Sequence, residues 1–268
     1  MGAELSICCD HESGKHAGRA MVGTTGISVW TVVIDAVPSA LWPRLVGLLN
    51  TAERERAERF MFERDRRAYQ VGQALKRLML SAHAGAVVEP QNWAFEFGRH
   101  GKPRVARGAG PQFNLSHCDG LVACAVSQHT ELGLDVENLD RQAPFEVLPI
   151  CFAASEKRWL RSLPAGAGQA AFFRLWTLKE AYIKATGMGL SQPLDALAFG
   201  LEPLAVTFLD PALGDPSAWR FEQRKIGARH ILSLAWRENV AAMPIGIAAV
   251  RLEALMEDDR NVCLEPDR

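Results

Sequence analysis

The apolar residues between Asn50 and about Ala84 follow a helical rhythm. They recur at three- and four-residue steps, at Ala68, Val71, Leu75, Leu78 and Ala82. Glu53 stands three residues after Asn50, which is the spacing of a helix-capping pair. The pattern therefore predicts a long amphipathic helix that buries one face and starts near Asn50.

Runs rich in β-branched residues, divided by turn residues, predict strands on both sides of this helix. The first is ISVWTVVID at 27–35, and Asp119-Gly120 divides residues 113–127 into a pair of strands. The other predicted strands lie within 93–105, 132–138, 197–209, 218–226, 230–237 and 245–252. Further helices are predicted near 39–50, over 153–163 and over 170–185.

This order of elements predicts an α+β protein of two comparable halves that meet near residue 130. We expect an N-terminal extension at 1–26, an N-terminal lobe at 27–130, a C-terminal lobe at 131–251 and a tail at 252–268. A chain of 268 residues is long enough for two such lobes, and 48% apolar residues can fill their cores.

Charge is nearly balanced, with 30 Lys and Arg against 31 Asp and Glu. A polyanion site would therefore have to be a local cluster. No apolar run approaches the roughly 20 residues that span a bilayer. The first residues lack a signal-peptide core, and the six cysteines form no CxxC pair. We expect a cytoplasmic protein with reduced thiols and with no nucleic-acid or membrane partner.

Two carboxylates share one face of the strand predicted at 132–138. Because side chains alternate along a strand, Gly133, Asp135 and Glu137 point one way, and the leucines and Val136 point the other. Like charges this close favour a neutralising cation, and oxygen ligands suit Mg²⁺. A solvated polar strand face explains the same pattern about equally well.

The segment FFRLWTLKEAYIKATGMG at 172–189 predicts a helix that ends at Gly187. Its packing stripe consists of Leu175, Leu178, Tyr182 and Ala185, whereas Trp176, Glu180 and Lys184 follow one another on another line. An acid followed by a base on one line fits a metal–phosphate site. A surface ion pair between Glu180 and Lys184 is the plainer alternative.

A third group of polar residues lies before the carboxylate strand. Ser116 and His117 end the strand FNLSH just before a turn, where polar donors can meet an anion, and Lys102 is exposed at a Gly-Pro turn in GKPR. Each of these has an ordinary structural or surface explanation when taken alone.

Taken together and in this order, GKP, FNLSH, GLDVE and WTLKEAYIKATGMGL resemble the 4′-phosphopantetheinyl transferase superfamily, in its two-lobed Sfp-like branch. AERFMFERDRRAYQVGQALKR resembles the first long helix of that family, and the likeness spans roughly residues 50–200. The resemblance implies two pseudo-symmetric α/β lobes with the active site in the cleft between them. It also implies Mg²⁺-dependent transfer of the phosphopantetheine arm of coenzyme A (CoA) to a serine of an apo carrier protein, which releases adenosine 3′,5′-bisphosphate.

By their place in the motifs, Asp135, Glu137 and Glu180 would hold Mg²⁺. Lys184 would hold phosphate, and Glu180 or a metal-bound water would accept the serine proton. His117 would take part in catalysis.

The resemblance also implies that Lys102, Ser116 and His117 contact CoA phosphates. Arg56 matches a position where the family uses a basic residue for the 3′-phosphate, and Arg67 and Tyr69 are weaker candidates for it. Glu53 stands where a second basic contact is expected, which is a departure from the family pattern.

The implied partner is an acyl, polyketide or peptidyl carrier protein of fatty-acid, polyketide or nonribosomal-peptide synthesis. Carriers are mostly acidic, so their docking surface should combine apolar and basic residues. Candidates are Phe145, Leu148, Phe152, Arg158, Met188 and Leu190, although most of these also suit a core. A chain that builds its own cleft is expected to be a monomer.

Two other functions stay open. A catalytically silent module that binds CoA or a carrier would have the same fold, although all three carboxylates are present. An unrelated Mg²⁺ phosphoryl-transfer enzyme has little support, because neither a GxxxxGK[ST] loop nor a kinase signature occurs.

Overall fold

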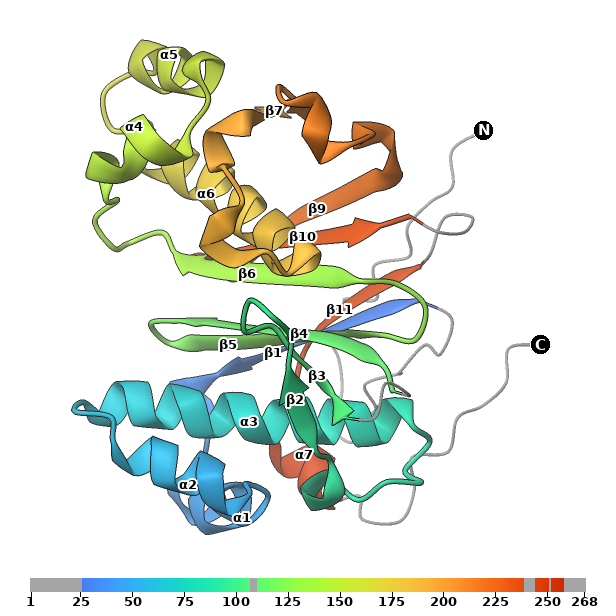
Figure 1. Ribbon diagram of the computed structural model, residues 1–268. Coiled ribbons are helices and arrows are strands. Elements are labelled where there is room, and N and C mark those ends of the chain that lie inside the picture. Colours follow the sequence, from blue (N-terminus) through green and yellow to red (C-terminus); the bar gives the residue numbers. More distant parts are fainter. Residues whose placement is uncertain (1–25, 107–109, 239–243, 251, 258–268) are drawn as a thin grey trace, which may run out of the picture.

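Two β-sheets pack face to face at the centre of the molecule, and a long helix covers the outer face of each (Figure 1). The computed structural model describes residues 26–106, 110–238, 244–250 and 252–257. The extension expected at 1–26 therefore lies outside the described residues, apart from Gly26. The mixed α+β class is confirmed.

The first sheet has the order β11-β1-β5-β4, with β1 at Ile27–Val33, β4 at Gln112–Cys118, β5 at Leu121–Ser127 and β11 at Ile245–Ala249. Helix α3 (Glu63–His83) lies on its outer face and buries Val71, Leu75 and Met79 against Trp30 and Val122. The predicted stripe of α3 is confirmed, since its members are buried except for the half-buried Leu78.

The second sheet has the order β6-β10-β9, with β6 at Leu132–Asn138, β9 at Trp219–Ile226 and β10 at His230–Arg237. Helix α6 (Gly168–Thr186) covers its outer face. A Cβ atom at Gly133 would lie 2.0 Å from the Ala181 carbonyl oxygen, so this glycine lets α6 rest directly on β6.

The two sheets bury their inner faces against each other. Val29, Leu121 and Ala123 of the first sheet meet Leu134 and Leu232 of the second in one core cluster. The predicted alternation along β6 is confirmed, because its leucines and Val136 belong to this inner cluster whereas Gly133 abuts α6.

The remaining elements surround this frame. In the first half they are α1 (Trp42–Gly47), α2 (Thr51–Glu58), β2 (Phe95–Phe97), β3 (Pro103–Val105) and α7 (Leu252–Glu257). In the second half they are α4 (Leu148–Cys151), α5 (Ala154–Ser162), β7 (Leu197–Leu201) and β8 (Leu204–Phe208). No helix among the described residues combines the length and apolar character needed to cross a membrane.

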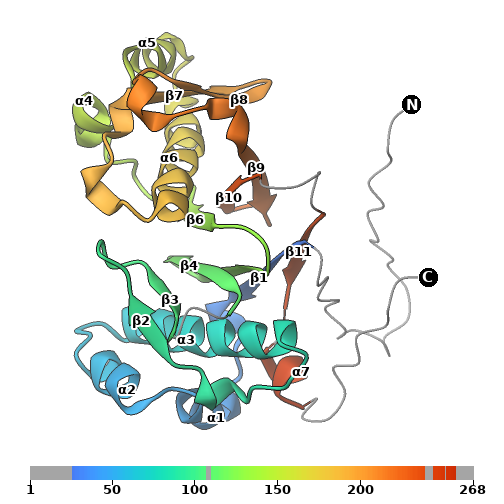
Figure 2. The same cartoon turned by 45° about the vertical axis from the view of Figure 1, so that its right-hand side comes forward.

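The last described strand and helix, β11 and α7, return to the first half (Figure 2). Strand β11, placed by the sequence pattern in the C-terminal lobe at 131–251, pairs in parallel with β1 instead. Helix α7, expected to be part of a separate tail, buries Leu252 and Met256 in the core beneath α3. The apolar residues of β11 and α7 complete the first core, which explains the return.

The edge strands of the two sheets, β4 and β6, lie side by side. Their link is made by side chains: Asn114 Oδ1 accepts the Leu134 N–H at 2.8 Å, and Ser116 Oγ accepts the Val136 N–H at 3.3 Å. This seam brings polar residues of β4 next to the carboxylates of β6.

Candidate active site

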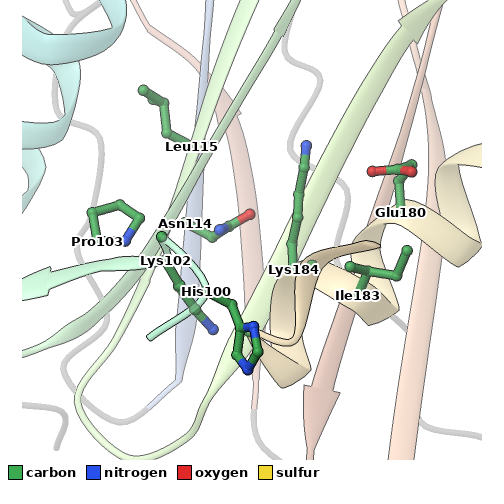
Figure 3. A pocket seen from close by; sticks show the side chains of 11 residues that line it. His100, Lys102, Pro103, Asn114, Leu115, Glu180, Ile183 and Lys184 are labelled. Atoms are coloured by element: carbon green, nitrogen blue, oxygen red, sulfur yellow. The ribbon is translucent and has the colours of Figure 1, made fainter. Parts of the chain in front are cut away.

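A cavity of about 310 Å³ opens between the β2–β3 hairpin, β4 and the C-terminal turns of α6 (Figure 3). Lys102 and His100 approach it from the hairpin, and Glu180, Ile183 and Lys184 from α6 (Figure 3). The other lining residues are Gly101, Pro103, Asn114, Leu115, Gly187 and Gly189. Both halves of the chain therefore contribute to one pocket.

Lys184 is half-buried and forms a polar triangle with the buried residues Asp135 and Ser116. Its Nζ atom lies 2.6 Å from Asp135 Oδ1 and 2.9 Å from Ser116 Oγ. Ser116 donates its hydroxyl to the same carboxylate oxygen at 2.9 Å. A strand from each half and the long helix of the second half meet in this triangle.

The hydroxyl of Ser116 is fully hydrogen-bonded to other groups of the protein. It donates to Asp135 and accepts from Lys184 and the Val136 N–H, and the residue is 5% exposed. In this arrangement Ser116 orients Asp135 and Lys184.

The second oxygen of Asp135 has no partner. Oδ2 is buried and makes no hydrogen bond with the described residues. A buried carboxylate oxygen without a donor is costly, so it indicates a place for a further cation or donor.

The negative charge of Asp135 helps to raise the pKa values of Glu180 and Glu137. Burial, then Asp135, then Glu137 raise the pKa of Glu180 above its ordinary value, although Lys184 opposes them. Burial and Asp135 likewise raise the pKa of Glu137, although its ion pair with Arg141 at 3.0 Å opposes them. Because α6 rests directly on β6, Glu180 lies on the same side of the molecule as the strand carboxylates, and Asp135, Glu137 and Glu180 are called the acidic cluster below.

The side chains of this cluster do not form a complete metal-binding site in the structure. Among the described residues, no three His, Cys, Asp or Glu side chains are grouped closely enough to hold an ion. Two of the carboxylates are instead paired within the protein, Asp135 with Lys184 and Glu137 with Arg141. The donor set nevertheless fits Mg²⁺, because it offers carboxylates with an unused buried oxygen.

His117 lies at the exposed end of β4, beside the acidic cluster. Partial desolvation and the Lys184 ammonium lower the pKa of its imidazole, against the opposing charges of Asp65 and Asp135. A neutral imidazole at neutral pH can both donate and accept a hydrogen bond.

Asn114 is a residue of the site that the sequence did not single out. It lines the pocket and holds the β4–β6 seam through the Leu134 N–H. Its signal was present, since Asn114 and Ser116 are two residues apart on one strand face, as are Asp135 and Glu137.

Lys102 lies at the pocket, and its ammonium is already engaged. Nζ donates to the carbonyl oxygens of Ala185 at 2.9 Å and Leu132 at 3.1 Å. Burial lowers the pKa of Lys102 to about 8, with Glu131 opposing.

The basic candidates around α2 lie apart from the pocket lining. Arg56 is exposed and stands over the Tyr69 ring at 5.4 Å, and Arg67 pairs with Glu63 and stands over Trp42. The structure therefore brings Lys102, Ser116, Asp135, Glu180 and Lys184 together, with Glu137 and His117 beside them, and leaves Arg56 outside.

The docking candidates divide between surface and core. Phe145 and Met188 are each 43% exposed and Arg158 is exposed, whereas Phe152 is fully buried and Leu148 is half-buried. The side chain of Leu190 lies outside the described residues. The core explanation is therefore correct for Phe152.

Comparison with known proteins matches nearly the whole described chain to one superfamily. A family model described as "4'-phosphopantetheinyl transferase superfamily" matches residues 131–235. A second, described as "4'-phosphopantetheinyl transferase, N-terminal", matches residues 37–129. Each covers one of the two helix-on-sheet halves, apart from β1, β11 and α7.

Named relatives agree with these matches. The chain is 37% identical over 182 residues to the 4′-phosphopantetheinyl transferase HetI of a Nostoc species, covering 66% of this chain and 75% of HetI. It is 35% identical over 153 residues to the 4′-phosphopantetheinyl transferase psf-1 of Bacillus pumilus, covering 57% of this chain and 64% of psf-1. The resemblance read from the motifs is thus confirmed, and the chain belongs to the 4′-phosphopantetheinyl transferase superfamily.

Proposed function

We propose that this transferase moves the 4′-phosphopantetheine arm of CoA to a serine of an apo carrier protein, with Mg²⁺, and releases adenosine 3′,5′-bisphosphate. The observation that carries the proposal is the acidic cluster of Asp135, Glu137 and Glu180, with an unused buried oxygen, beside Lys184 in a pocket formed by both halves.

The metal would be held by Asp135, Glu137 and Glu180. When bound, Mg²⁺ neutralises charge on the diphosphate of CoA and so favours attack at phosphorus. A cation held there would offset the negative charge of Asp135, which raises the pKa values of Glu137 and Glu180 in the protein alone.

The phosphates of CoA would meet the basic and neutral donors around the cluster. Lys184 carries its charge at the pocket wall, where it can serve a phosphate oxygen as well as Asp135. His117 is a neutral donor beside it. Arg56 would reach the 3′-phosphate only if CoA extends beyond the described pocket lining, because Arg56 lies on the outside of α2.

The transfer itself needs a nucleophile, a base and a leaving group. The carrier serine oxygen attacks the phosphorus that bears pantetheine, and a P–O bond forms as the bond to the adenosine 3′,5′-bisphosphate oxygen breaks. The serine proton would pass to Glu180 or to a water held beside the acidic cluster. Positioning of the serine supplies a further part of the rate.

The partner would be an acyl, polyketide or peptidyl carrier protein, met by a monomeric transferase in the cytoplasm. The three described cysteines, Cys118, Cys124 and Cys151, are free thiols, which suits a reducing compartment.

The test is a transfer assay with Mg²⁺, CoA and a panel of apo carrier proteins. Mass spectrometry should show one phosphopantetheine added to at least one carrier. Asp135→Asn should abolish the gain, while Glu55→Gln, an exposed acid on α2, should leave it unchanged. If the wild-type protein modifies no carrier yet binds CoA, the catalytically silent module is the better description.

A further inference from the structure

Lys102 lies in the β2–β3 hairpin of the first half, and its side chain is hydrogen-bonded to two elements of the second half, β6 and α6. Its ammonium donates to the Leu132 carbonyl, at the start of β6, and to the Ala185 carbonyl, in the last turn of α6. The last four carbonyls of a helix have no partner within it, so Lys102 satisfies one that would otherwise need water. A positive charge at this end also suits the helix dipole.

The methylene groups of the Lys102 side chain pack against Gly187 at the C-terminal end of α6. Gly187 ends α6 with a φ of 69°, and its N–H donates to the Ile183 carbonyl at 2.9 Å. A Cβ atom at Gly187 would lie 3.1 Å from Lys102 Cδ. The glycine is thus required both for the left-handed backbone and for the lysine stem that packs over it.

These contacts connect opposite walls of the pocket. One wall is the hairpin turn, with His100, Gly101 and Pro103, and the other is the end of α6, with Lys184 and Gly187 (Figure 3). Lys102 belongs to the first wall and is bonded to the second. Two of its three N–H donors are used in this way, which leaves little of the ammonium for a ligand.

We propose that Lys102 is a positioning residue: it clasps the β2–β3 hairpin to the end of α6 and thereby fixes where Glu180 and Lys184 stand in the pocket. This differs from the direct phosphate contact that the motif GKP implies. Its effect on catalysis rests on the proposed function, whereas the clasp itself does not.

Hydrogen exchange of the free protein tests the clasp without any ligand. Lys102→Met keeps the stem over Gly187 and removes the charge. We expect amides of the last turn of α6 and the residues after it, 184–189, to exchange about tenfold faster, since two charge-assisted hydrogen bonds are lost. Arg104→Met is the matched control, because Arg104 lies in the same hairpin and forms an exposed ion pair with Glu96. Unchanged exchange in Lys102→Met would overturn the proposal.

Steady-state kinetics tests the consequence for the site. A positioning residue predicts that Lys102→Met lowers kcat at saturating CoA, because Glu180 and Lys184 are displaced, whereas a simple phosphate contact raises KM for CoA and leaves kcat unchanged. The second pattern would overturn the positioning role. Lys102→Arg should restore both exchange and kcat in part, since it can still donate to two carbonyls. If the wild-type protein transfers nothing, the proposed function fails while the exchange result still stands.

Discussion

The acids near the two long helices are paired to different extents, and the clearest contrast is between Glu53 in the first half and the acidic cluster of Asp135, Glu137 and Glu180 in the second. In the first half, Glu53 accepts from Lys76 at 3.2 Å and from Arg77 at 2.8 Å, and it also closes the capping box with Asn50. In the second half, Asp135 keeps one oxygen without a partner, and Glu180 forms no ion pair with the described residues.

The pKa directions express the same difference. Burial alone would raise the pKa of Glu53, but Lys76, the Asn50 N–H and Arg77 together lower it. The pKa of Glu180 is raised, because burial and two neighbouring carboxylates exceed the effect of one lysine. We call Glu53, Lys76 and Arg77 the closed cluster, because its bases stabilise the ionised carboxylate. We call the acidic cluster of Asp135, Glu137 and Glu180 the open cluster, because its negative charge favours binding of a further cation. Glu53, where the resemblance led us to expect a basic contact, is thus fully engaged within the protein by Asn50, Lys76 and Arg77.

The closed cluster should dominate stability. Glu53→Ala leaves Lys76 and Arg77 buried without their carboxylate, so we expect the free energy of unfolding to fall by about 3–5 kcal/mol. Chemical denaturation measures this loss. The exposed pair of Arg104 and Glu96 provides the control, since Glu96→Ala should change stability by less than about 1 kcal/mol. A loss of similar size at both positions would contradict the distinction.

The open cluster should dominate activity instead. Glu180→Gln removes the proposed base, and we expect kcat to fall about 10²- to 10⁴-fold. The free energy of unfolding should stay the same or rise, because a carboxylate repelled by Asp135 and Glu137 is removed. The transfer assay and denaturation, done on the same preparation, separate the two effects. Full activity in this variant would remove Glu180 from the chemistry.

The contact between β6 and α6 sets how closely the acids of the open cluster approach one another. A methyl group at Gly133 would meet the Ala181 carbonyl oxygen at 2.0 Å and the Ala185 nitrogen at 2.2 Å. Gly133→Ala should therefore cost about 1–3 kcal/mol in unfolding free energy and lower kcat as α6 moves away. Gly47→Ala is the matched control, because nothing lies within 4 Å of its added methyl group.

His83 is a buried titratable side chain of the first half, and its substitution gives the smallest effect. His83 is buried, neither ring nitrogen has a hydrogen-bond partner among the described residues, and burial lowers its pKa to about 4. Between pH 6.5 and 4 this histidine is protonated in the unfolded chain and neutral in the folded chain. The free energy of unfolding therefore falls as the pH falls. The slope should be at most about 1.4 kcal/mol per pH unit, and His83→Leu should remove it. Denaturation at several pH values checks this.

Much of this arrangement follows from local patterns in the sequence. The alternation along 132–138 placed Asp135 on the α6 face, the stripe of α6 is buried as predicted, and Asp119-Gly120 turns between β4 and β5. Each depends on neighbours a few residues apart, which a sequence displays directly.

Other features depend on contacts between distant segments. The helix expected from Asn50 is divided into α2 and α3, because Phe62 adopts an extended backbone without any Gly or Pro to signal a break. The parallel pairing of β11 with β1 joins the two ends of the chain. The tie from Lys102 to Ala185 spans 83 residues, so the motif GKP cannot reveal it.

The most direct measurement is the binding of a divalent cation to the open cluster in the presence of CoA. Mn²⁺, a spectroscopic substitute for Mg²⁺, should bind the wild-type protein at one site. Asp135→Asn should weaken that binding at least about tenfold, while Glu55→Gln, on the exposed face of α2, should bind as the wild type does. Equal affinity in the wild type and Asp135→Asn would show that these carboxylates do not hold the metal, and would contradict the contrast between the Glu53 cluster and the acidic cluster.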